Sequence, residues 1–440
     1  MAKKRRNREP VTLRVESISH EGRGVARDAH GKTVFVAGAL PGETVIARCY
    51  RFHRRFDEAR VEQVLEPAPE RVAPRCPHAG VCGGCSLQHL DPAAQMAHKQ
   101  SVLLEQLEHL GGVRPEAVLE PLTGPLWGYR HKARLGVKYV EKKGLALVGF
   151  REQGSPYITE MGGCEVLHES VGRRITALRE LITSLDARAR IPQIEAAVDD
   201  SQTVLVFRHL DPLSDADRRR LADFARETGL AICLQPQGPE SIHPLWPEGG
   251  VTLSYTLPGS GIELQFLPSG FTQVNPAINR AMVERAVALL DPGPEDAVLE
   301  LFCGLGNFSL PLARKAGRVH GVEGDEALVE RARANAERND LGNVTFEAAN
   351  LMAGELAGEF MEPAFDKLLL DPPRSGAQEV LRQLDLERVR RIVYVSCNPA
   401  TLARDAGLLV NERGYRLLRA GVMDMFPHTA HVESITLFER

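Results

Sequence analysis

Apolar and polar positions change their spacing along this chain of 440 residues, and the change divides it into regions. Residues 11–66 contain short β-rich runs separated by turn residues such as Pro41-Gly42. Several short strands at this spacing indicate a small β-barrel. From about residue 270 apolar runs alternate with helical or looped segments, which is typical of a parallel doubly wound sheet. Its expected strands are 298–302, 319–323, 344–346, 367–370 and 392–395, with 434–438 as an edge strand.

Helix signals frame the region between these two patterns. Residues 93–110 place leucines on one face, and Gly111-Gly112 follows as a stop signal. Asn275-Pro276 is a good helix start, because proline is tolerated in the first turn. The intervening residues mix strands, such as 133–137 and 203–207, with helices around 165–185 and 214–228.

The charge is distributed unevenly. Residues 1–60 hold 14 Lys and Arg against seven Asp and Glu, so this part carries +7 while the whole chain carries −4. The N-terminal barrel is therefore the expected polyanion-facing part. The run Lys3 to Arg8 is equally well read as a solvated tail. Residues 51–56 interleave rings with cations, which suits stacking on bases, although a hairpin tip with exposed charges has the same composition.

No apolar stretch approaches a membrane span, and the basic run Lys3-Lys4-Arg5-Arg6 is not followed by an apolar signal core. We expect a soluble, cytoplasmic protein. Its eight cysteines do not resemble a disulfide framework. Cys76, Cys82, Cys85 and the distant Cys164 supply four soft ligands, and their spacing is as compatible with zinc as with an iron–sulfur cluster.

A glycine-containing loop follows the strand expected to end at Phe302. Gly304 and Gly306 allow the backbone to pass close to a nucleotide-like ligand, and Asn307 follows them. The third position of a dinucleotide fingerprint is Ser309 instead of glycine, which favours a cofactor without a pyrophosphate. The next strand ends at Glu323, where a carboxylate can accept hydrogen bonds from ribose hydroxyls.

Two further loops lie at expected strand tips. Asp371-Pro372-Pro373-Arg374 is a stiff turn expected to aim its carbonyls and its carboxylate into the site. Cys397 ends another buried run, which places a thiol at the edge where such sheets bind ligands. One reaction that needs such a thiol is the alkylation of carbon 5 of uracil, in which a thiolate adds at carbon 6 of the ring. If the thiol has this role, we expect the site to favour its thiolate form. Cys303 is interpreted as a core cysteine.

These motifs together resemble those of the bacterial uracil carbon 5 RNA methyltransferases, in particular the large-subunit ribosomal RNA enzymes that carry a TRAM domain and a 4Fe-4S cluster. The resemblance covers nearly the whole chain. It rests on C-x5-C-G-G-C with the later Cys164, F-x-Q-x-N, L-F-C-G-x-G-N-F, D-P-P-R, S-C-N-P and H-V-E. It implies Cys397 as nucleophile and Glu433 as proton-abstracting base. The residues that it implies for S-adenosylmethionine are Gln273, Phe302, Asn307, Glu323, Asn350 and Asp371.

The resemblance also implies an architecture. The fold class is α/β, with a Rossmann-like methyltransferase domain at 269–440, an OB-like RNA-binding TRAM barrel at 1–69 and a mixed α+β iron–sulfur domain at 70–268. Residues of about 93–130 are expected to pack with the catalytic domain, and the segment from Tyr129 to Arg134 is a candidate RNA surface or a solvated basic loop. The implied cluster ligands are Cys76, Cys82, Cys85 and Cys164.

The implied activity is methylation of carbon 5 of a uridine in 23S ribosomal RNA, without a membrane or an obligate protein partner. This activity has three alternatives. A transfer RNA substrate is disfavoured because relatives acting there generally lack the TRAM domain and the cluster. A noncatalytic RNA-binding or redox protein is disfavoured by the intact Cys397, Asp371 and Glu433. Cytosine methylation usually requires a Pro-Cys dipeptide, whereas this chain has Ser396-Cys397.

Overall fold

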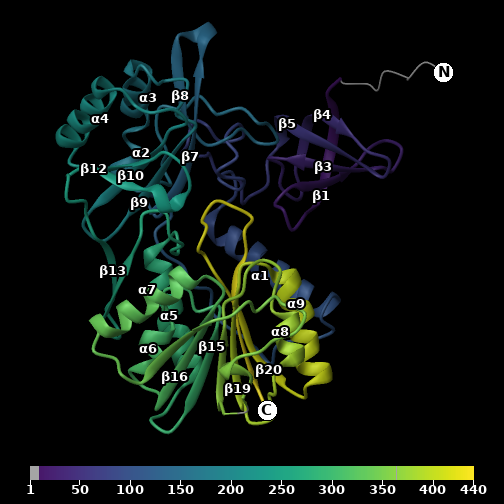
Figure 1. The fold of residues 1–440 in the computed structure, drawn as a ribbon. Helices are drawn as coiled ribbons and strands as arrows, with labels where there is room; N and C mark the ends of the chain where they lie inside the picture. The colour runs from purple at the N-terminus through teal and green to yellow at the C-terminus, as the bar shows by residue number, and fades with distance from the viewer. Residues whose placement is uncertain (1–8, 363) are drawn as a thin grey trace. The chain divides into compact units, whose positions relative to one another are not determined.

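The computed structural model describes residues 9–362 and 364–440, so the basic run Lys3 to Arg8 lies outside the described residues. The chain forms two compact units (Figure 1). The first comprises the chain up to Lys99 together with Phe150–Thr159 and Phe426–His431. The second comprises Gln100–Gly149, Glu160–Met425 and Val432–Arg440. Each unit therefore takes segments from distant parts of the sequence.

The first unit contains a closed five-stranded barrel in the order β1-β2-β3-β5-β4. Alternate positions of its strands point inward, and residues such as Leu13, Val34 and Val45 form its core. Closure leaves no unpaired strand edge, which stabilises so small a sheet. The barrel expected from the sequence is confirmed, with strands β1 (Val11–Ile18), β2 (Gly24–Arg27), β3 (Thr33–Ala37), β4 (Thr44–Phe52) and β5 (Phe56–Glu66).

The ring- and cation-rich segment 51–56 lies at the β4–β5 hairpin. His53, Arg54 and Arg55 form the turn, and the imidazole of His53 stacks on Phe56 with centroids 4.3 Å apart. Arg54 and Arg55 are exposed. The segment is thus a hairpin tip that presents two cations next to partly buried rings. It is a hairpin tip with exposed charges, and it also has the rings and cations that suit stacking on bases.

The last segment of the first unit, Phe426–His431, packs against the beginning of α1 (Pro92–His109). The side-chain oxygen of Gln95 accepts a hydrogen bond from the backbone N–H of His428 at 2.9 Å. Lys99 donates to the carbonyl of Phe426 at 3.0 Å. His428 is buried and has a φ of +64°, so it serves the packing of this unit.

The second unit contains a mixed six-stranded sheet in the order β12-β11-β10-β9-β7-β8, in which only β10 and β11 pair in parallel. Its strands are β7 (Lys132–Val140), β8 (Leu145–Gly149), β9 (Gln193–Val198), β10 (Thr203–Arg208), β11 (Ala231–Gln235) and β12 (His243–Trp246). The helices of this region are α2 (Glu169–Gly172), α3 (Ile175–Ser184) and α4 (Asp215–Thr228), and the hairpin of β13 (Leu253–Leu257) and β14 (Ile262–Phe266) follows.

The same unit contains an eight-stranded sheet in the order β17-β16-β15-β18-β19-β21-β20-β6. Its first five strands are parallel, and they are β15 (Ala297–Leu301), β16 (Arg318–Glu323), β17 (Val344–Ala348), β18 (Lys367–Leu370) and β19 (Arg391–Ser396). Figure 1 shows α5 (Pro276–Leu290), α6 (Ser309–Ala313) and α7 (Glu326–Arg338) on one side of the strands and α8 (Gln378–Gln383) and α9 (Pro399–Gly407) on the other. This is the expected doubly wound arrangement.

Three strands complete this sheet on the side of β19. They are β21 (Glu433–Glu439), β20 (Arg416–Met423) and the short β6 (Ala117–Val118). The prediction that 434–438 forms an edge strand is wrong, because β20 and β6 pair outside it. Nearly every residue of β21 is buried, as expected of a strand that is covered on both faces and paired on both edges.

Within the described residues, no helix is long and apolar enough to cross a membrane.

Candidate active site

The candidate site lies at the carboxyl ends of the five parallel strands. Strand order reverses between β15 and β18, because the chain runs from β15 outward to β17 and then returns to β18 on the other side. Crossovers diverge at such a point and leave a crevice, which is where doubly wound sheets bind ligands. Four of the residues expected from the sequence end or directly follow these strands, namely Phe302, Glu323, Asp371 and Cys397, and Asn350 lies two residues beyond the end of β17.

The loop after β15 is held in a conformation that requires positive φ angles. Phe302, Gly304 and Gly306 have φ values of +64°, +55° and +94°. The strand therefore ends at Leu301, one residue earlier than expected, because Phe302 turns out of it. A methyl group at Gly304 would meet no atom within 4 Å, so this backbone borders open space. The loop can thus present its backbone to a ligand, as its glycines predicted.

The carboxylate of Glu323 is held by hydrogen bonds from backbone N–H groups, one of which belongs to this loop. One carboxylate oxygen accepts the N–H of Gly304 at 3.0 Å. The other accepts the N–H groups of Gly324 at 2.8 Å and of Asp325 at 3.2 Å. A carboxylate has about four acceptor sites, so it retains capacity to accept from ribose hydroxyls. These bonds fix the direction of the side chain before any ligand binds.

Asn307 is oriented by two residues that sequence reasoning missed. Its side-chain oxygen accepts from the Tyr255 hydroxyl at 2.9 Å and from the Asn279 amide at 3.1 Å. Its own amide nitrogen donates to the Asn279 oxygen at 2.9 Å. Burial raises the pKa of Tyr255, so its hydroxyl remains a donor. Tyr255 lies in the β13–β14 hairpin, and no motif in the sequence connects that hairpin to the glycine loop.

Gln273 lies near the residues that orient Asn307. It lines a small pocket together with Tyr255, Asn279 and His131. The chain on both sides of Gln273 is held from the start of β7, because His131 N–H donates to the carbonyl of Val274 at 2.8 Å and the Lys132 ammonium donates to the carbonyl of Pro268. Asn350 is exposed, and its side-chain oxygen accepts the N–H of Met352 at 3.1 Å in the turn after β17.

The candidate RNA segment from Tyr129 to Arg134 is largely engaged inside the protein. Tyr129 is buried, and burial lowers the pKa of His131 to about 4 and that of Lys132 to about 8. Arg134 has an exposed side chain, which pairs with Glu195 at 2.8 Å. Two of its polar residues, His131 and Lys132, thus hold the segments around Gln273, and contact of this segment with RNA stays a prediction.

Glu300 is a buried carboxyl group inside β15 that the sequence analysis did not consider. It accepts a hydrogen bond from the Ser309 hydroxyl, and burial raises its pKa to about 8. Burial and the charge of Glu323 also raise the pKa of Asp371, to about 7. Carboxyl groups thus gather below the glycine loop, and such a group favours a positively charged ligand. The sequence feature that could have identified Glu300 is its position as a lone acidic residue within the apolar run Val298 to Leu301.

Cys397 and Glu433 lie next to each other because of strand register. β19 and β21 are antiparallel, and Ser396 is paired with Ser434. Cys397 directly follows Ser396, and Glu433 directly precedes Ser434. The two side chains therefore come from facing positions at the edge of the sheet where the parallel strands end. The sequence alone, in which they are 36 positions apart, does not show this.

The electrostatics of this pair differ from expectation. Burial and then the charges of Glu433 and Asp371 raise the pKa of the Cys397 thiol, and only Arg374 lowers it appreciably among charged groups. Burial and Asp371 hold the pKa of Glu433 well above its usual range, again against Arg374. The expectation that the site favours the thiolate is wrong for the free protein, because burial and two carboxyl groups outweigh one guanidinium. Cys303 is buried, as expected for a core cysteine.

Hydrogen bonds connect the D-P-P-R turn to the segment that follows Cys397. The carbonyl of Arg374 accepts from the Asn398 amide at 2.9 Å and from the Thr401 hydroxyl at 3.2 Å. Asn398 also caps α9 by accepting the N–H of Ala400 at 3.1 Å. The Arg374 carbonyl thus faces the start of α9 instead of a ligand, and it fixes the turn beside the candidate nucleophile.

The cysteine motif of the first unit supplies donors of the right kind for a cluster. Cys76, Cys82 and Cys85 form no disulfide, and the sulfur of Cys82 accepts the N–H of Gly84 at 3.4 Å. Such N–H to sulfur bonds accompany cluster thiolates. Cys164 lies in the second unit. Across residues 9–362 and 364–440, no group of three or more His, Cys, Asp and Glu side chains is arranged to hold a metal ion.

Comparisons with known proteins agree with this fold and site. Residues 251–440 match the family model described as tRNA (Uracil-5-)-methyltransferase, and residues 4–61 match the TRAM domain. The chain is 56% identical to the 23S rRNA (uracil(1939)-C(5))-methyltransferase RlmD of Alkalilimnicola ehrlichii, covering 100% of this chain and 99% of that protein. It is 52% identical to the protein of the same name from Hahella chejuensis, with the same coverage.

A solved structure shares the fold. The Pyrococcus abyssi tRNA (uracil-54, C5)-methyltransferase, in complex with S-adenosyl-L-homocysteine, superposes with a TM-score of 0.74 at 24% identity. The match covers 97% of this chain and 100% of that one. This match shows that the chain shares its fold with that protein over nearly its whole length.

The fold and the site define an S-adenosylmethionine-dependent RNA methyltransferase. The chain belongs to the RNA uracil-C5-methyltransferase family, within the group of relatives named as 23S rRNA enzymes.

The support of Asn307 by Tyr255 can be tested with Tyr255→Phe. A hydrogen bond of this kind is worth about 0.5–1.5 kcal/mol, so we expect binding of S-adenosylhomocysteine to weaken roughly 2- to 12-fold, measured by isothermal titration calorimetry. Tyr139→Phe, in strand β7 of the same unit, is the matched control and should leave the affinity unchanged. Equal affinities for the two variants would show that Tyr255 does not orient a cofactor ligand.

Proposed function

We propose that this protein transfers a methyl group from S-adenosylmethionine to carbon 5 of a uridine in 23S ribosomal RNA. The observation that carries the chemistry is the pairing of Ser396 with Ser434, which places a thiol beside a buried carboxyl group at the ligand-binding edge. The substrate is supported by relatives that are 52–56% identical over essentially the whole chain and are named for uracil 1939. We propose the same uridine here, and an enzyme with this substrate is expected in the cytoplasm.

Cys397 is the proposed nucleophile. Its sulfur adds to carbon 6 of uracil as a thiolate, which makes carbon 5 nucleophilic. When bound, S-adenosylmethionine supplies an electrophilic methyl group, which carbon 5 accepts. The raised pKa of the Cys397 thiol in the free protein means that its proton must leave before or as the bond to carbon 6 forms. Arg374 is the nearby cation that favours the thiolate.

Glu433 is the proposed base. After methylation carbon 5 still carries its original proton, and removal of that proton allows the carbon–sulfur bond to break and release Cys397. A carboxylate with a raised pKa is a stronger base than an exposed one, and burial gives Glu433 this property. Its position opposite Cys397 brings it to the same uracil ring. By the resemblance, Gln273, Phe302, Asn307, Glu323, Asn350 and Asp371 hold the cofactor.

The N-terminal barrel is the proposed RNA-binding part. It contains most of the residues that match the TRAM domain, and the chain up to residue 60 carries a net charge of +7. Arg54 and Arg55 are exposed at the β4–β5 turn, next to the stacked rings of His53 and Phe56. Cations beside aromatic rings suit contact with phosphates and unpaired bases.

The function can be tested by offering two substrates in parallel. We expect purified protein with S-adenosylmethionine to form 5-methyluridine in unmodified 23S ribosomal RNA and none in transfer RNA, as measured by mass spectrometry of digested nucleosides. Methylation of transfer RNA alone would support the proposed reaction but contradict the proposed ribosomal RNA substrate. No methylation of either RNA would support a noncatalytic RNA-binding protein.

The roles of the pair can be tested with Glu433→Gln. Glutamine cannot accept the carbon 5 proton, so we expect a methylated RNA to remain covalently attached to Cys397 and turnover to fall by about 10²-fold or more. Denaturing gel electrophoresis with labelled RNA measures the adduct. Cys397→Ala should give neither adduct nor product, whereas Cys233→Ala, a buried thiol in β11, should behave as the parent. Normal turnover by Cys397→Ala would overturn the mechanism.

We further propose that Cys76, Cys82, Cys85 and Cys164 bind a 4Fe-4S cluster. Four thiolates suit such a cluster, and the Gly84 N–H donates to the Cys82 sulfur. When bound, a cluster with four protein ligands is coordinatively closed, so it would join chain segments without taking part in methyl transfer.

The cluster can be tested by metal analysis. Anaerobically purified protein should contain about four iron atoms per chain with acid-labile sulfide. Cys82→Ser should lose the iron and its visible absorption, while Cys233→Ser should retain both. Stoichiometric zinc without iron in the parent protein would contradict the proposal and favour the zinc alternative.

A further inference from the structure

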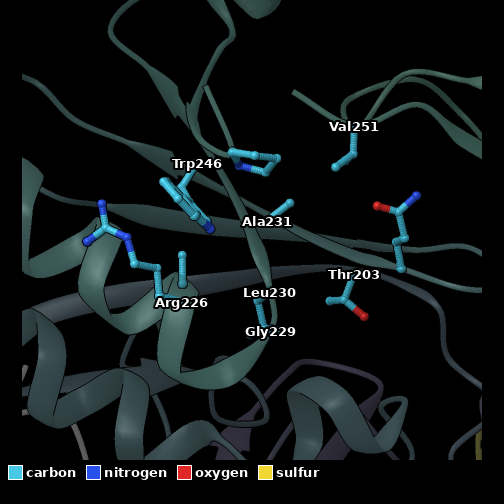
Figure 2. A pocket seen from close by; sticks show the side chains of 10 residues that line it. Thr203, Arg226, Gly229, Leu230, Ala231, Trp246 and Val251 are labelled. Carbon is cyan, nitrogen blue, oxygen red and sulfur yellow. The ribbon is translucent and has the colours of Figure 1, made fainter. Parts of the chain in front are cut away.

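A pocket of about 330 Å³ opens in the second unit, at the end of the six-stranded sheet that carries β12. It lies between the start of β10, the start of β11, the end of α4 and the end of β12. Figure 2 shows Trp246 on one side, Thr203 on the other and Ala231 between them. Its volume is at the lower end of the range of about 300–1,000 Å³ that is typical of small-ligand sites. None of the proposed catalytic or cofactor residues lines it.

The hollow exists because small residues line its floor. Ala225, Gly229 and Ala231 have little or no side chain, and they come from the end of α4 and the beginning of β11. Gly229 ends α4 with a φ of +70°, and a methyl group there would meet no atom within 4 Å. The sheet is otherwise closely packed at this point, since Thr203 and Leu230 are buried. The pocket is therefore framed by regular secondary structure instead of by loose loops.

An aromatic platform forms one wall of the pocket. The guanidinium of Arg226 lies 4.3 Å from the centroid of the Trp246 ring. Arg226 is held by an ion pair with Asp223 at 2.5 Å, one helical turn away on α4. In Figure 2 the Trp246 ring lies between Arg226 and the interior of the pocket. A cation on one face of an indole fixes the ring and leaves the other face for a flat ligand.

Polar residues line the pocket opposite this platform. The Thr203 hydroxyl is engaged by the Ser170 hydroxyl at 2.7 Å and points away from Trp246 in Figure 2. Gln202, which is exposed, contributes an amide that can both donate and accept. A ring to stack on, with donors and acceptors across a narrow gap, suits a planar heterocycle with polar edges.

We propose that this pocket binds an unpaired nucleobase of the RNA substrate, stacked on Trp246 and contacted at its edge by Gln202. Proteins that read RNA commonly take up bases splayed out of the chain, stack them on aromatic or arginine planes and bond their edges. The inference rests on the proposed RNA substrate. It adds a second base-binding position, on the central sheet, to the uracil site at the edge of the methyltransferase sheet.

The test uses the fluorescence of Trp246. The chain has only two tryptophans, Trp127 and Trp246, so full-length Trp127→Phe protein reports on Trp246 alone. Titration with an unmodified 23S ribosomal RNA fragment containing the target uridine should quench this emission. Trp246→Ala should bind the fragment about 5- to 150-fold more weakly, the usual effect of removing one stacked base, and should raise the KM for RNA with an unchanged KM for S-adenosylmethionine.

Further variants keep the result interpretable. Trp246→Phe preserves a ring and should recover most of the RNA affinity, which a variant with a merely damaged fold would not do. An unchanged thermal midpoint and unchanged cofactor binding in Trp246→Ala would confirm that the fold is intact. Trp127→Phe is the matched control for removal of a tryptophan and should leave the RNA affinity unaltered.

The outcomes separate this inference from the proposed function. If the parent protein forms 5-methyluridine but RNA neither quenches Trp246 nor binds less tightly to Trp246→Ala, the base pocket is wrong and the enzyme assignment stands. If RNA binds and quenches Trp246 without methylation, the pocket stands and the enzyme assignment fails. A response to ribosomal proteins but not to naked RNA would assign the pocket to a protein partner and overturn the inference.

Discussion

The pairing of β19 with β21 is the constraint on which the candidate chemistry depends. These strands are joined by backbone hydrogen bonds in a single register, with Ser396 opposite Ser434, and their residues are buried on both faces. A slip of one residue would turn every side chain to the other face and expose apolar surface, so burial specifies the register strongly. Since Cys397 and Glu433 flank the paired serines, the packing of the sheet core also fixes the distance between these two residues.

The environment around this pair is unfavourable for charge in the free protein. Cys397, Glu433 and Asp371 all have raised pKa values, since burial removes water and each carboxyl group opposes ionisation of its neighbours. Glu300 adds a further buried carboxyl group below the glycine loop. A raised proton affinity suits Glu433 for the proposed role of base, and acidic surroundings suit a cofactor that carries a positive sulfonium. The same features that cost stability thus prepare the site for its ligands.

Hydrogen bonds within and outside the motifs hold the motif residues in place. Tyr255 and Asn279 orient Asn307, and the backbone of Gly304 fixes Glu323. Asn398 and Thr401 hold the turn that carries Arg374. Tyr255 and Asn279 lie on a hairpin and on a helix that a motif search does not connect with the glycine loop. These hydrogen bonds allow the strand-end loops, which would otherwise be the most mobile parts of a doubly wound sheet, to present a defined arrangement.

The sequence by itself determined most of the secondary-structure elements and the strand ends that carry the candidate site. Alternation of apolar runs with turn residues identified the barrel, and buried runs followed by glycine, proline or cysteine identified the strand ends, because local propensity and burial act over a few neighbouring residues. Only the tertiary structure decided what depends on pairing and desolvation. It placed β21 inside the sheet, engaged His131 and Lys132 in hydrogen bonds with the segments around Gln273, and raised the pKa of Cys397. It also brought Glu433 next to Cys397 and opened a pocket beside Trp246. Each of these features depends on groups that are far apart in the chain. A local sequence pattern does not show which distant groups will pack together, so it does not predict these features.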